Sequence, residues 1–395
     1  MAENKEVVVL GGVRTPIGKF GGSLKDFTPS NLATMTAVEA IKRSGLRLDE
    51  IEQTVYGHVL NTEAADVYMG RIVALKAGLP IETPGLTVNR LCGSGLQAIA
   101  TASEQIILGN ATTALAGGTE VMSRSQYWLP AMRWGARLND SQVIDSLVSV
   151  LTDPLENCHM GITAERVGQR YNCTREDQDN LAYESHRRAV EAADEGYFKE
   201  QILPIEIKTK QGVTIFDTDE GPRRDANVAA MAKLKPAFDP EGTVTAGNAS
   251  SINDAAASVV LMERKAAEAR GLKPMARFVG YAVAGVDPKI MGLGPAPATR
   301  KALERTGLSI KDMDVIELNE AFAAQALGVI RELDLPMDIT NPHGSGISLG
   351  HPVAASGVIL TIKALYELER IGGRYALVTL CIGGGQGIAA IFERL

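Results

Sequence analysis

An internal repeat is the feature that most constrains how this chain folds. Three short segments recur at one offset in degenerate form: AIKRSGL at 40–46, SGL at 94–96 and ALA at 114–116 reappear as ALERTGL at 302–308, SGV at 356–358 and ALV at 376–378. Gly45, for example, corresponds to Gly307, because 307 − 45 = 262. A constant offset across three segments predicts two copies of one α/β unit.

The repeat also relates three unusual residues. Cys92 heads a glycine-rich turn of the first copy, and His351 lies three residues before the equivalent of that turn in the second. Cys381 occupies the position that corresponds to Thr119. A site that uses all three side chains is therefore expected where the two halves meet.

The repeat exposes an insertion in the first copy. Glu393, in the closing segment IFER, follows Cys381 by 393 − 381 = 12 residues. The similar segment VVLMER reaches Glu263 only 263 − 119 = 144 residues after Thr119, so 144 − 12 = 132 residues are interposed. We expect three parts: an N-terminal half (1–119 with 248–274), an inserted loop domain (120–247) and a C-terminal half (275–395).

Composition narrows the class of protein. A chain of 395 residues with 45% hydrophobic residues and 40 glycines suits packed α/β layers with tight turns. We expect a cytoplasmic protein without membrane spans, since no apolar run is long enough and no signal pattern precedes the first strand. Four cysteines without paired spacing argue against a disulfide scaffold or a metal site. A net charge of −7 disfavours nucleic acid as a partner.

Short apolar runs alternate with segments of helical period in both halves. The expected strands are 6–10, 53–59, 85–88, 113–116, 276–281, 315–318 and 376–380, and the expected helices are 30–44, 95–108, 299–305 and 357–369. Such alternation predicts parallel strands covered by helices on both faces. We expect two such layered halves stacked against each other.

Cys92 lies in NRLCGSGLQA, where a strand ends and an apolar helix begins. At a helix N-terminus the unpaired N–H groups and the helix dipole favour a thiolate, which predicts a nucleophile. A buried core cysteine is the other interpretation, and this segment alone fits both.

His351 lies in a glycine-rich loop directly before Pro352. Backbone restraint on both sides suits a base that must be aimed. The alternative, a solvent-exposed turn histidine, leaves the neighbouring apolar residues Ile347, Leu349 and Val353 unexplained.

Cys381 opens CIGGGQG directly after a strand. A nucleotide loop is disfavoured because no Lys-Ser/Thr pair follows the glycines. A cysteine beside glycine N–H groups better suits proton transfer next to an oxyanion hole. Asn319, in ELNEAFAAQ, places an amide at a strand-to-helix junction, where it could act in the site, cap the helix, or do both.

Together, NRLCGSGLQA, NEAFAAQ, GHP and CIGGGQG resemble the motifs of the thiolase family, in the acetyl-CoA acetyltransferase and bacterial β-ketothiolase group. The resemblance extends from VRTPIGKFGG near the start to the last ten residues. It implies two pseudo-symmetric βαβαβαββ halves with an inserted loop domain. It also implies an acyltransferase that condenses two acetyl-CoA to acetoacetyl-CoA and cleaves short 3-ketoacyl-CoA in reverse, through an acyl-cysteine.

The resemblance assigns the catalytic roles. It implies that Cys92 is the acylated nucleophile, His351 the base that activates it, and Cys381 the acid/base at the α-carbon of the second acetyl-CoA. Asn319 is expected to hold a water that forms one oxyanion hole with His351. The backbone N–H groups of Cys92 and Gly383 are expected to form the other.

The resemblance likewise implies that coenzyme A is a substrate and that no bound cofactor or metal takes part. His159 and Met160 match the segment that lies along the pantetheine, and Ser250 matches a pantetheine contact. Arg223 matches a residue near the nucleotide end, and Phe322 of NEAFAAQ is expected to contact substrate.

Two positions depart from the family pattern. His343 stands where Asn is usual, and Ala354 stands where Gly is usual. His343 adds a titratable group that could change the pH profile or the substrate preference. Ala354 requires a negative φ or some tolerated strain.

The second cysteine distinguishes thiolases from other enzymes with a reactive cysteine. Ketoacyl synthases and hydroxymethylglutaryl-type synthases also use a cysteine with a histidine but lack the second cysteine, so Cys381 argues against them. A non-catalytic thiolase-like protein is expected to lose one of the cysteines. Trp128, Met132 and Trp134 in the inserted region predict a partner surface, and the resemblance implies a homotetramer built as a dimer of dimers.

Overall fold

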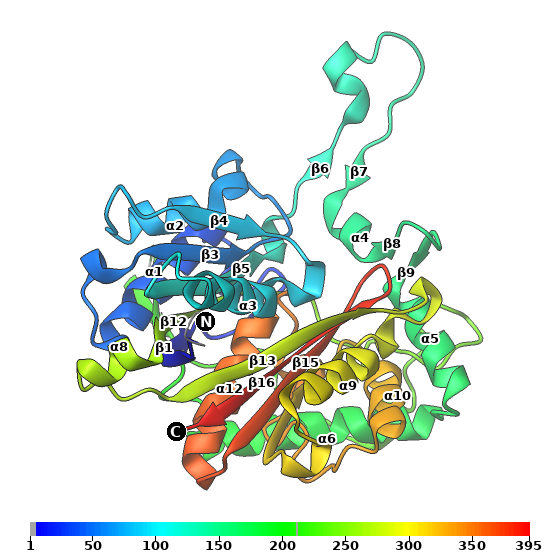
Figure 1. The fold of residues 1–395 in the computed structure, drawn as a ribbon. Coiled ribbons are helices and arrows are strands. Elements are labelled where there is room, and N and C mark those ends of the chain that lie inside the picture. Colours follow the sequence, from blue (N-terminus) through cyan, green and yellow to red (C-terminus); the bar gives the residue numbers. More distant parts are fainter. Residues whose placement is uncertain (1–4, 211) are drawn as a thin grey trace.

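The computed structural model describes residues 5–210 and 212–395. Within those residues, both halves of the repeat contribute to one ten-stranded mixed sheet (Figure 1). Its strands run in the order β14-β15-β16-β13-β1-β12-β5-β3-β4, and β2 pairs with β12. No helix of the described residues combines the length and apolar content that crossing a bilayer requires.

In its described residues, from Lys5 on, the N-terminal half supplies six strands and four α-helices. They are β1 (Val7–Arg14), β2 (Gly18–Lys19), α1 (Pro29–Ser44), β3 (Gln53–Gly57), α2 (Met69–Lys76), β4 (Gly85–Val88), α3 (Ser94–Ile107), β5 (Thr113–Val121), β12 (Asn253–Glu263) and α8 (Arg264–Ala269). The C-terminal half supplies β13 (Ala276–Gly285), α9 (Pro295–Thr306), β14 (Val315–Leu318), α10 (Ala323–Leu333), α11 (Gly346–Leu349), α12 (Ser356–Ile371), β15 (Tyr375–Ile382) and β16 (Gln386–Arg394).

The elements reproduce the sequence repeat. Three pairs of elements begin 262 residues apart, namely β3 and β14, α3 and α12, and β5 and β15. Their first residues are 53 and 315, 94 and 356, and 113 and 375. The ends of α1 and α9 correspond in the same way. Gly45 and Gly307 follow these helices in the left-handed conformation, with φ of 76° and 68°, which glycine adopts without steric cost.

The two halves are joined through their central helices. Helices α3 and α12 pack against each other in the middle of the molecule (Figure 1). Gly95 and Gly357, again 262 residues apart, allow the close approach. A Cβ on Gly95 would lie 2.6 Å from the carbonyl oxygen of Ala354, and one on Gly357 would lie 2.4 Å from the backbone nitrogen of Leu96.

The halves are also joined edge to edge. Strand β1 pairs antiparallel with β13, so the two half-sheets are continuous. The prediction of parallel strands holds for β3 with β4 and β5, and for β14 with β15. It is wrong for β1, β12, β13 and β16, which pair antiparallel. A tight turn at Gly383–Gly385 joins β15 to β16, and so short a connection can only reverse the chain.

The inserted region leaves the sheet after Val121 and returns at Asn253. Its elements are β6 (Tyr127–Trp128), β7 (Ile144–Asp145), α4 (Ser146–Val150), β8 (Thr152–Asp153), β9 (Cys158–His159), α5 (Met160–Arg170), α6 (Arg175–Asp194), β10 (Ile205–Thr209), β11 (Gly212–Phe216) and α7 (Val228–Met231). Helix α6 packs against α10 and α11 of the C-terminal half. The segment 125–145, which contains β6 and β7, projects from the body as an arm (Figure 1).

Candidate active site

Cys92, His351 and Cys381 line one cavity of about 60 Å³ where the two halves meet. Cys92 belongs to the first half, and the other two belong to the second. The remaining lining residues are mainly apolar; they are Leu91, Val150, Leu151, Met160, Ser250, Met291, Ala321, Phe322, Val353 and Gly383. The cavity therefore combines two thiols and one imidazole with a largely apolar lining.

Cys92 lies in a 3-10 turn, η3 (Leu91–Gly93), between β4 and α3. Leu91 has a φ of 45°, a strained conformation for a residue with a side chain, directly before the candidate nucleophile. Burial raises the pKa of Cys92 to about 11, although the N–H groups of Gly383 and of Cys92 itself oppose the shift. The prediction that the helix N-terminus favours a thiolate is thus wrong for the free protein: α3 begins only at Ser94, and desolvation dominates.

His351 is held by two neighbouring polar side chains. Its backbone N–H donates to Oδ1 of Asn253 at 2.9 Å, and its Nδ1 lies 2.6 Å from Oγ of Ser356. The Ser356 hydroxyl donates to the carbonyl oxygen of Pro352, so Nδ1 of His351 carries the hydrogen of this contact. Burial lowers the pKa of His351 to about 4, so the ring is neutral, with Nε2 able to accept a proton.

Asn319 lies beside this histidine rather than on the wall of the Cys92 cavity. It directly follows β14 and is buried, and its Nδ2 is 3.4 Å from Nε2 of His351 and 3.5 Å from Nδ1. The interpretation of Asn319 as a helix cap is wrong, because α10 begins after Phe322 and no side chain caps it.

Cys381 and Gly383 also line the cavity. Cys381 is buried in β15, and burial raises the pKa of its thiol far above the usual range, with the Cys92 thiol as a second cause. Gly383 begins the turn to β16. A Cβ at this position would lie 2.8 Å from Cε of Met160 and 3.2 Å from Cδ1 of Leu91, so a side chain here would displace these two side chains of the cavity wall.

The five residues expected to contact the substrate divide into two groups. Met160, Ser250 and Phe322 line the cavity with Cys92. His159 does not: its Nδ1 accepts from the N–H of Gly161 at 3.0 Å, and its ring stacks on Phe238 at 4.4 Å. His159 therefore caps the N-terminus of α5, which begins at Met160. Arg223 lines a different pocket.

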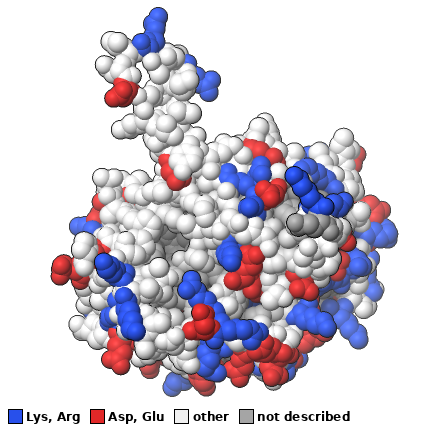
Figure 2. Space-filling model, turned by 180° about the vertical axis from the view of Figure 1, so that it is seen from behind, with Lys and Arg blue, Asp and Glu red and all other residues white. Residues whose placement is uncertain are grey.

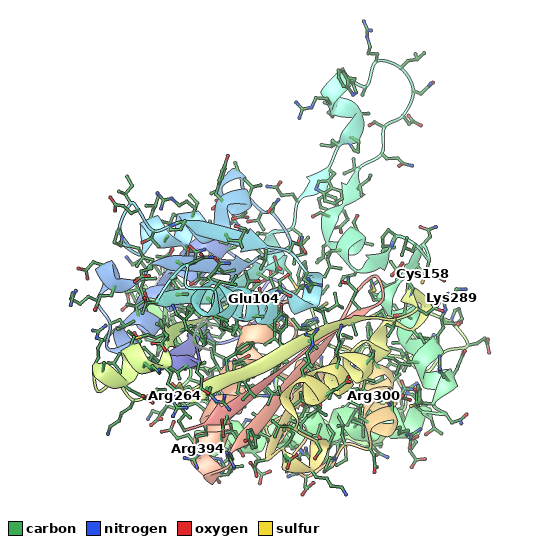
Figure 3. The ribbon with its side chains drawn as sticks, viewed as in Figure 1. Glu104, Cys158, Arg264, Lys289, Arg300 and Arg394 are labelled. Atoms are coloured by element: carbon green, nitrogen blue, oxygen red, sulfur yellow. The ribbon has the colours of Figure 1, made fainter. Side chains whose placement is uncertain are left out.

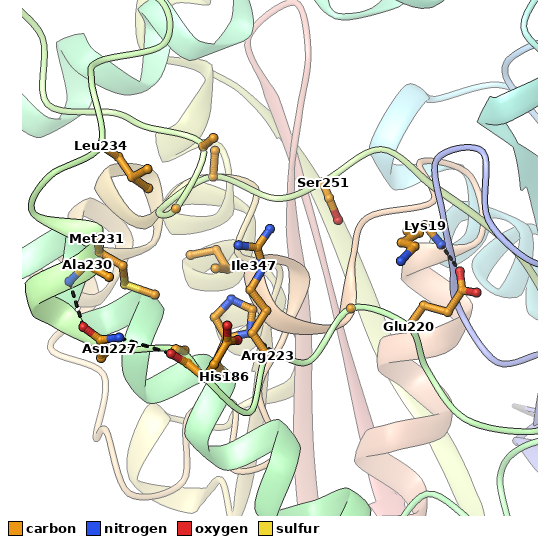
Figure 4. A pocket seen from close by; sticks show the side chains of 16 residues that line it. Lys19, His186, Glu220, Arg223, Asn227, Ala230, Met231, Leu234, Ser251 and Ile347 are labelled. Carbon is orange, nitrogen blue, oxygen red and sulfur yellow. Dashed lines mark hydrogen bonds between the residues drawn. The ribbon is translucent and has the colours of Figure 1, made fainter.

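That second pocket has a volume of about 410 Å³ (Figure 4). Ala249 and Ser251 line it, whereas Ser250 between them lines the smaller cavity, so one short segment separates the two. The Arg223 side chain extends into the pocket in Figure 4. Within the described part of the chain, no acidic side chain forms an ion pair with it. Arg224 instead pairs with Asp194 at 2.8 Å outside this pocket.

The two unusual positions have different environments. Nε2 of His343 lies 2.7 Å from Oε2 of Glu367, and His343 lines neither of the two pockets. Ala354 is buried and is not among the residues with positive φ, so its side chain causes no backbone strain.

Three residues near the site, namely Ser356, Asn253 and Glu120, were not predicted from the sequence. Ser356 and Asn253 hold His351, and Glu120 accepts from the N–H of Ala354 at 3.2 Å. Ser356 follows His351 by five residues, and its repeat counterpart is Ser94, which was a signal available in the sequence. Cys158, which is labelled in Figure 3, does not line the cavity that holds Cys92 and Cys381. Across residues 5–210 and 212–395, no three His, Cys, Asp or Glu side chains form a metal-binding group.

Comparisons with known proteins agree over nearly the whole chain. Residues 7–265 match the N-terminal thiolase domain, and residues 272–394 match the C-terminal thiolase domain. The chain is 57% identical to "Beta-ketothiolase BktB" of Cupriavidus necator over 392 residues, 99% of this chain and 100% of that protein. It is 43% identical to the human mitochondrial 3-ketoacyl-CoA thiolase, over 100% of this chain and 99% of that protein.

Solved structures give the same result. The acetyl-CoA acetyltransferase of Bacillus anthracis superposes with a TM-score of 0.97 and 46% identity over the full length of both chains. The human mitochondrial 3-ketoacyl-CoA thiolase in complex with CoA superposes with a TM-score of 0.96 and 42% identity, over 100% of this chain and 99% of that one. The two family domains together match residues 7–265 and 272–394, and the chain belongs to the thiolase family.

Proposed function

We propose that the protein is an acyltransferase that condenses two acetyl-CoA to acetoacetyl-CoA and, in reverse, cleaves short 3-ketoacyl-CoA with coenzyme A. The observation that carries this proposal is the meeting of Cys92, His351 and Cys381 in one small apolar cavity. Acyl transfer needs one nucleophile, and carbon–carbon bond formation needs a second group that removes an α-proton. The cavity holds one candidate for each task.

The first half-reaction forms an acyl-enzyme on Cys92. Nε2 of His351 accepts the thiol proton as Sγ of Cys92 attacks the thioester carbonyl carbon. The N–H groups of Cys92 and Gly383 both face this sulfur, which suits them to stabilise the oxyanion. The bond to the coenzyme A sulfur then breaks, and Cys381 gives its proton to the departing thiolate.

The second half-reaction forms the carbon–carbon bond. The Cys381 thiolate removes an α-proton from the second acetyl-CoA, and Asn319 with His351 stabilises the enolate oxygen, Asn319 through a water. The enolate carbon attacks the acyl group, and the bond to Sγ of Cys92 breaks. Protonated His351 returns its proton to Cys92. Burial raises the pKa of Cys381, so its thiolate is a strong base once it forms.

The two adjoining pockets suggest how coenzyme A binds. The nucleotide end would occupy the larger pocket beside Arg223, and the thioester would reach Cys92 past Ser250 and Met160. His159 acts by positioning Met160, and Phe322 forms part of the acyl wall. The CoA complex of the human relative supports this class of ligand.

One assay tests the proposal. Purified protein is mixed with acetoacetyl-CoA and coenzyme A, and the loss of the β-keto absorbance is followed. We expect cleavage by the wild type and none by Cys92→Ala. No cleavage by the wild type, or equal rates for both proteins, would show that the proposal is wrong.

We also propose that the protein is a cytoplasmic homotetramer. The arm carries exposed apolar side chains, namely Tyr127, Trp128, Leu129, Met132 and Trp134, and viewed from behind it is mostly uncharged except near its outer end (Figure 2). Exposed apolar surface of this kind favours a partner. All four cysteines are free thiols, as is usual in a reducing compartment. Light scattering should give the mass of four subunits for the wild type. The double variant Trp134→Ser with Met132→Ser should give a lower mass.

A further inference from the structure

Three buried ionisable side chains next to the active site have no part in the mechanism above. His58, Glu120 and Asp66 are exposed by 3%, 0% and 0%. Nδ1 of His58 lies 3.5 Å from Oε1 of Glu120, and its Nε2 lies 3.6 Å from Oδ2 of Asp66. One imidazole thus faces two buried carboxylates, which would repel each other in a medium of low dielectric constant without it.

The repeat places His58 at a significant position. Its counterpart is Glu320, because 320 − 58 = 262, and each residue lies just beyond the carboxyl end of a corresponding strand, β3 or β14. In the second half this position adjoins Asn319, which reaches His351. Both halves therefore place a buried ionisable side chain just beyond the end of the same strand, although the carboxylate of Glu320 accepts from Ser185 and Asn341 rather than from a group of the site.

The hydrogen bonds around His58 favour its charged form. Nδ1 lies 3.0 Å from the carbonyl oxygen of Thr119, so this nitrogen carries a hydrogen. Oδ2 of Asp66 accepts from the N–H of Thr62 at 2.7 Å and from the N–H of Glu63 at 3.1 Å, contacts that stabilise a carboxylate. A second proton, on Nε2 of His58, would face this carboxylate.

The electrostatics agree with that assignment. Burial alone would lower the pKa of His58, but the Glu120 carboxylate, followed by Asp66 and the Thr119 carbonyl, raises it to about 9. In the described part of the chain, those two carboxylates are the charged groups that face His58. Burial raises the pKa of Glu120, and the charge of His58 is the largest of the effects that lower it. The titratable groups that act on or respond to Glu120 are His58 and Cys92.

Glu120 links this group to both halves of the site. Its Oε1 accepts from the N–H of Leu60 at 2.9 Å, and its Oε2 accepts from the N–H of Ala354 at 3.2 Å. Leu60 packs in the apolar cluster that contains Cys92. Ala354 lies between His351 and Ser356, the residue that holds the imidazole. The Glu120 carboxylate therefore joins the segment beside the nucleophile to the turn that aims the base.

We propose that His58 is a positioning residue: its positive charge keeps Glu120 ionised, and ionised Glu120 holds the turn that carries His351. The inference rests on the proposed function only in treating Cys92 and His351 as the reacting pair. A charge-assisted hydrogen bond is about twice as strong as a neutral one. Without His58, burial protonates Glu120, the bond to Ala354 weakens, and His351 is less well aimed.

Infrared difference spectroscopy tests the charge of Glu120 without any activity. At pH 7 the spectrum of His58→Gln minus that of His58→Gln with Glu120→Gln should contain the carbonyl band of one buried protonated carboxyl group. The spectrum of wild type minus Glu120→Gln should lack it. Absence of the band in the first difference, or its presence in the second, would overturn the proposal.

Kinetics test the effect on catalysis. Wild-type cleavage of acetoacetyl-CoA is established first, so a failure of the proposed function is distinct from a failure of this inference. We expect His58→Gln to lower kcat by roughly tenfold or more with little change in KM, since small misplacement of a reacting group is costly. Relative to wild type, kcat should recover as the pH rises and Glu120 ionises. The double variant His58→Gln with Glu120→Gln should have the same kcat as Glu120→Gln, and its kcat should not recover at high pH. Additive losses of kcat in the double variant would refute the mechanism. So would a ratio of the His58→Gln kcat to the wild-type kcat that does not change with pH.

A measurement on the wild type covers the case in which His58→Gln does not fold. The chain has five histidines, so protein labelled with 13C-histidine should give few imidazole signals. The His58 signal, identified as the one whose pKa falls most in Glu120→Gln, should be that of an imidazolium at pH 7.5. A neutral His58 at that pH would overturn the proposal.

Discussion

Ser356 lies 2.6 Å from His351, through Oγ and Nδ1, and this contact fixes which ring nitrogen can act as the base. We expect Ser356→Ala to lower kcat by roughly 10- to 100-fold with little change in KM, because the imidazole loses its orientation but no substrate contact is removed. Steady-state kinetics with acetoacetyl-CoA measure both parameters. Ser103→Ala is the matched control: Ser103 is buried in α3, and its hydroxyl donates to the Ile99 carbonyl of the same helix. Equal effects of the two variants would contradict the role of Ser356.

The two cysteines of the cavity should be separable by half-reaction. Cys381→Ser should still form the acyl-enzyme, although more slowly, because the departing thiolate loses its proton donor. It should exchange the α-protons of acetyl-CoA with deuterated solvent at least about 10²-fold more slowly, because the base is lost. Mass spectrometry of the acyl-enzyme and NMR of acetyl-CoA measure the two steps. Cys173→Ser, at a buried thiol outside the cavity, is the control. Unimpaired exchange in Cys381→Ser would identify another base.

Two adjacent arginines should differ in their effect on coenzyme A. Arg223 lines the larger pocket, whereas Arg224 pairs with Asp194 and does not line it. Arg223→Ala should raise the KM for coenzyme A by about tenfold and leave kcat unchanged, because contacts to a remote part of the substrate are equal in the ground and transition states. Arg224→Ala should leave both parameters unchanged. A rise in KM confined to Arg224→Ala would refute the binding mode.

The sequence predicted the repeated elements because periodicity and turn residues are local signals. The predicted strand 85–88 matches β4, and the predicted helix 95–108 matches α3 within one residue at each end. The pairing of β1 with β13 was not predictable in this way, since it depends on register between segments about 270 residues apart.

Within the site, the motifs identified the residues that react but not those that hold them. His351 and Cys381 carry functional groups with few other uses in a glycine-rich loop. Glu120 and His58 look like ordinary polar residues in sequence, and only their burial beside Ala354 and Thr119 reveals a role. The charge state of Cys92 was mispredicted for a similar reason, because desolvation depends on the whole fold.

His343 should stabilise the fold rather than tune the reaction. Burial alone would raise the pKa of Glu367, but hydrogen bonds from His343 and Arg370 lower it from 4.5 to about 2. A depressed carboxyl pKa adds stability that is present above pH 4.5 and is lost as the pH falls toward 2. His343→Asn should therefore lower the free energy of unfolding by about 2 kcal/mol near neutral pH.

The difference between wild type and His343→Asn should shrink between pH 4.5 and 2, as Glu367 takes up a proton in both proteins. Denaturant unfolding at a series of pH values measures it. The pH profile of kcat should be unchanged, because His343 lines neither the Cys92 cavity nor the larger pocket. A shifted pH profile of kcat in His343→Asn, with an unchanged free energy of unfolding, would instead assign His343 to the reaction. A side chain that acts only through Glu367 would change the stability of the fold before it changed proton transfer at Cys92.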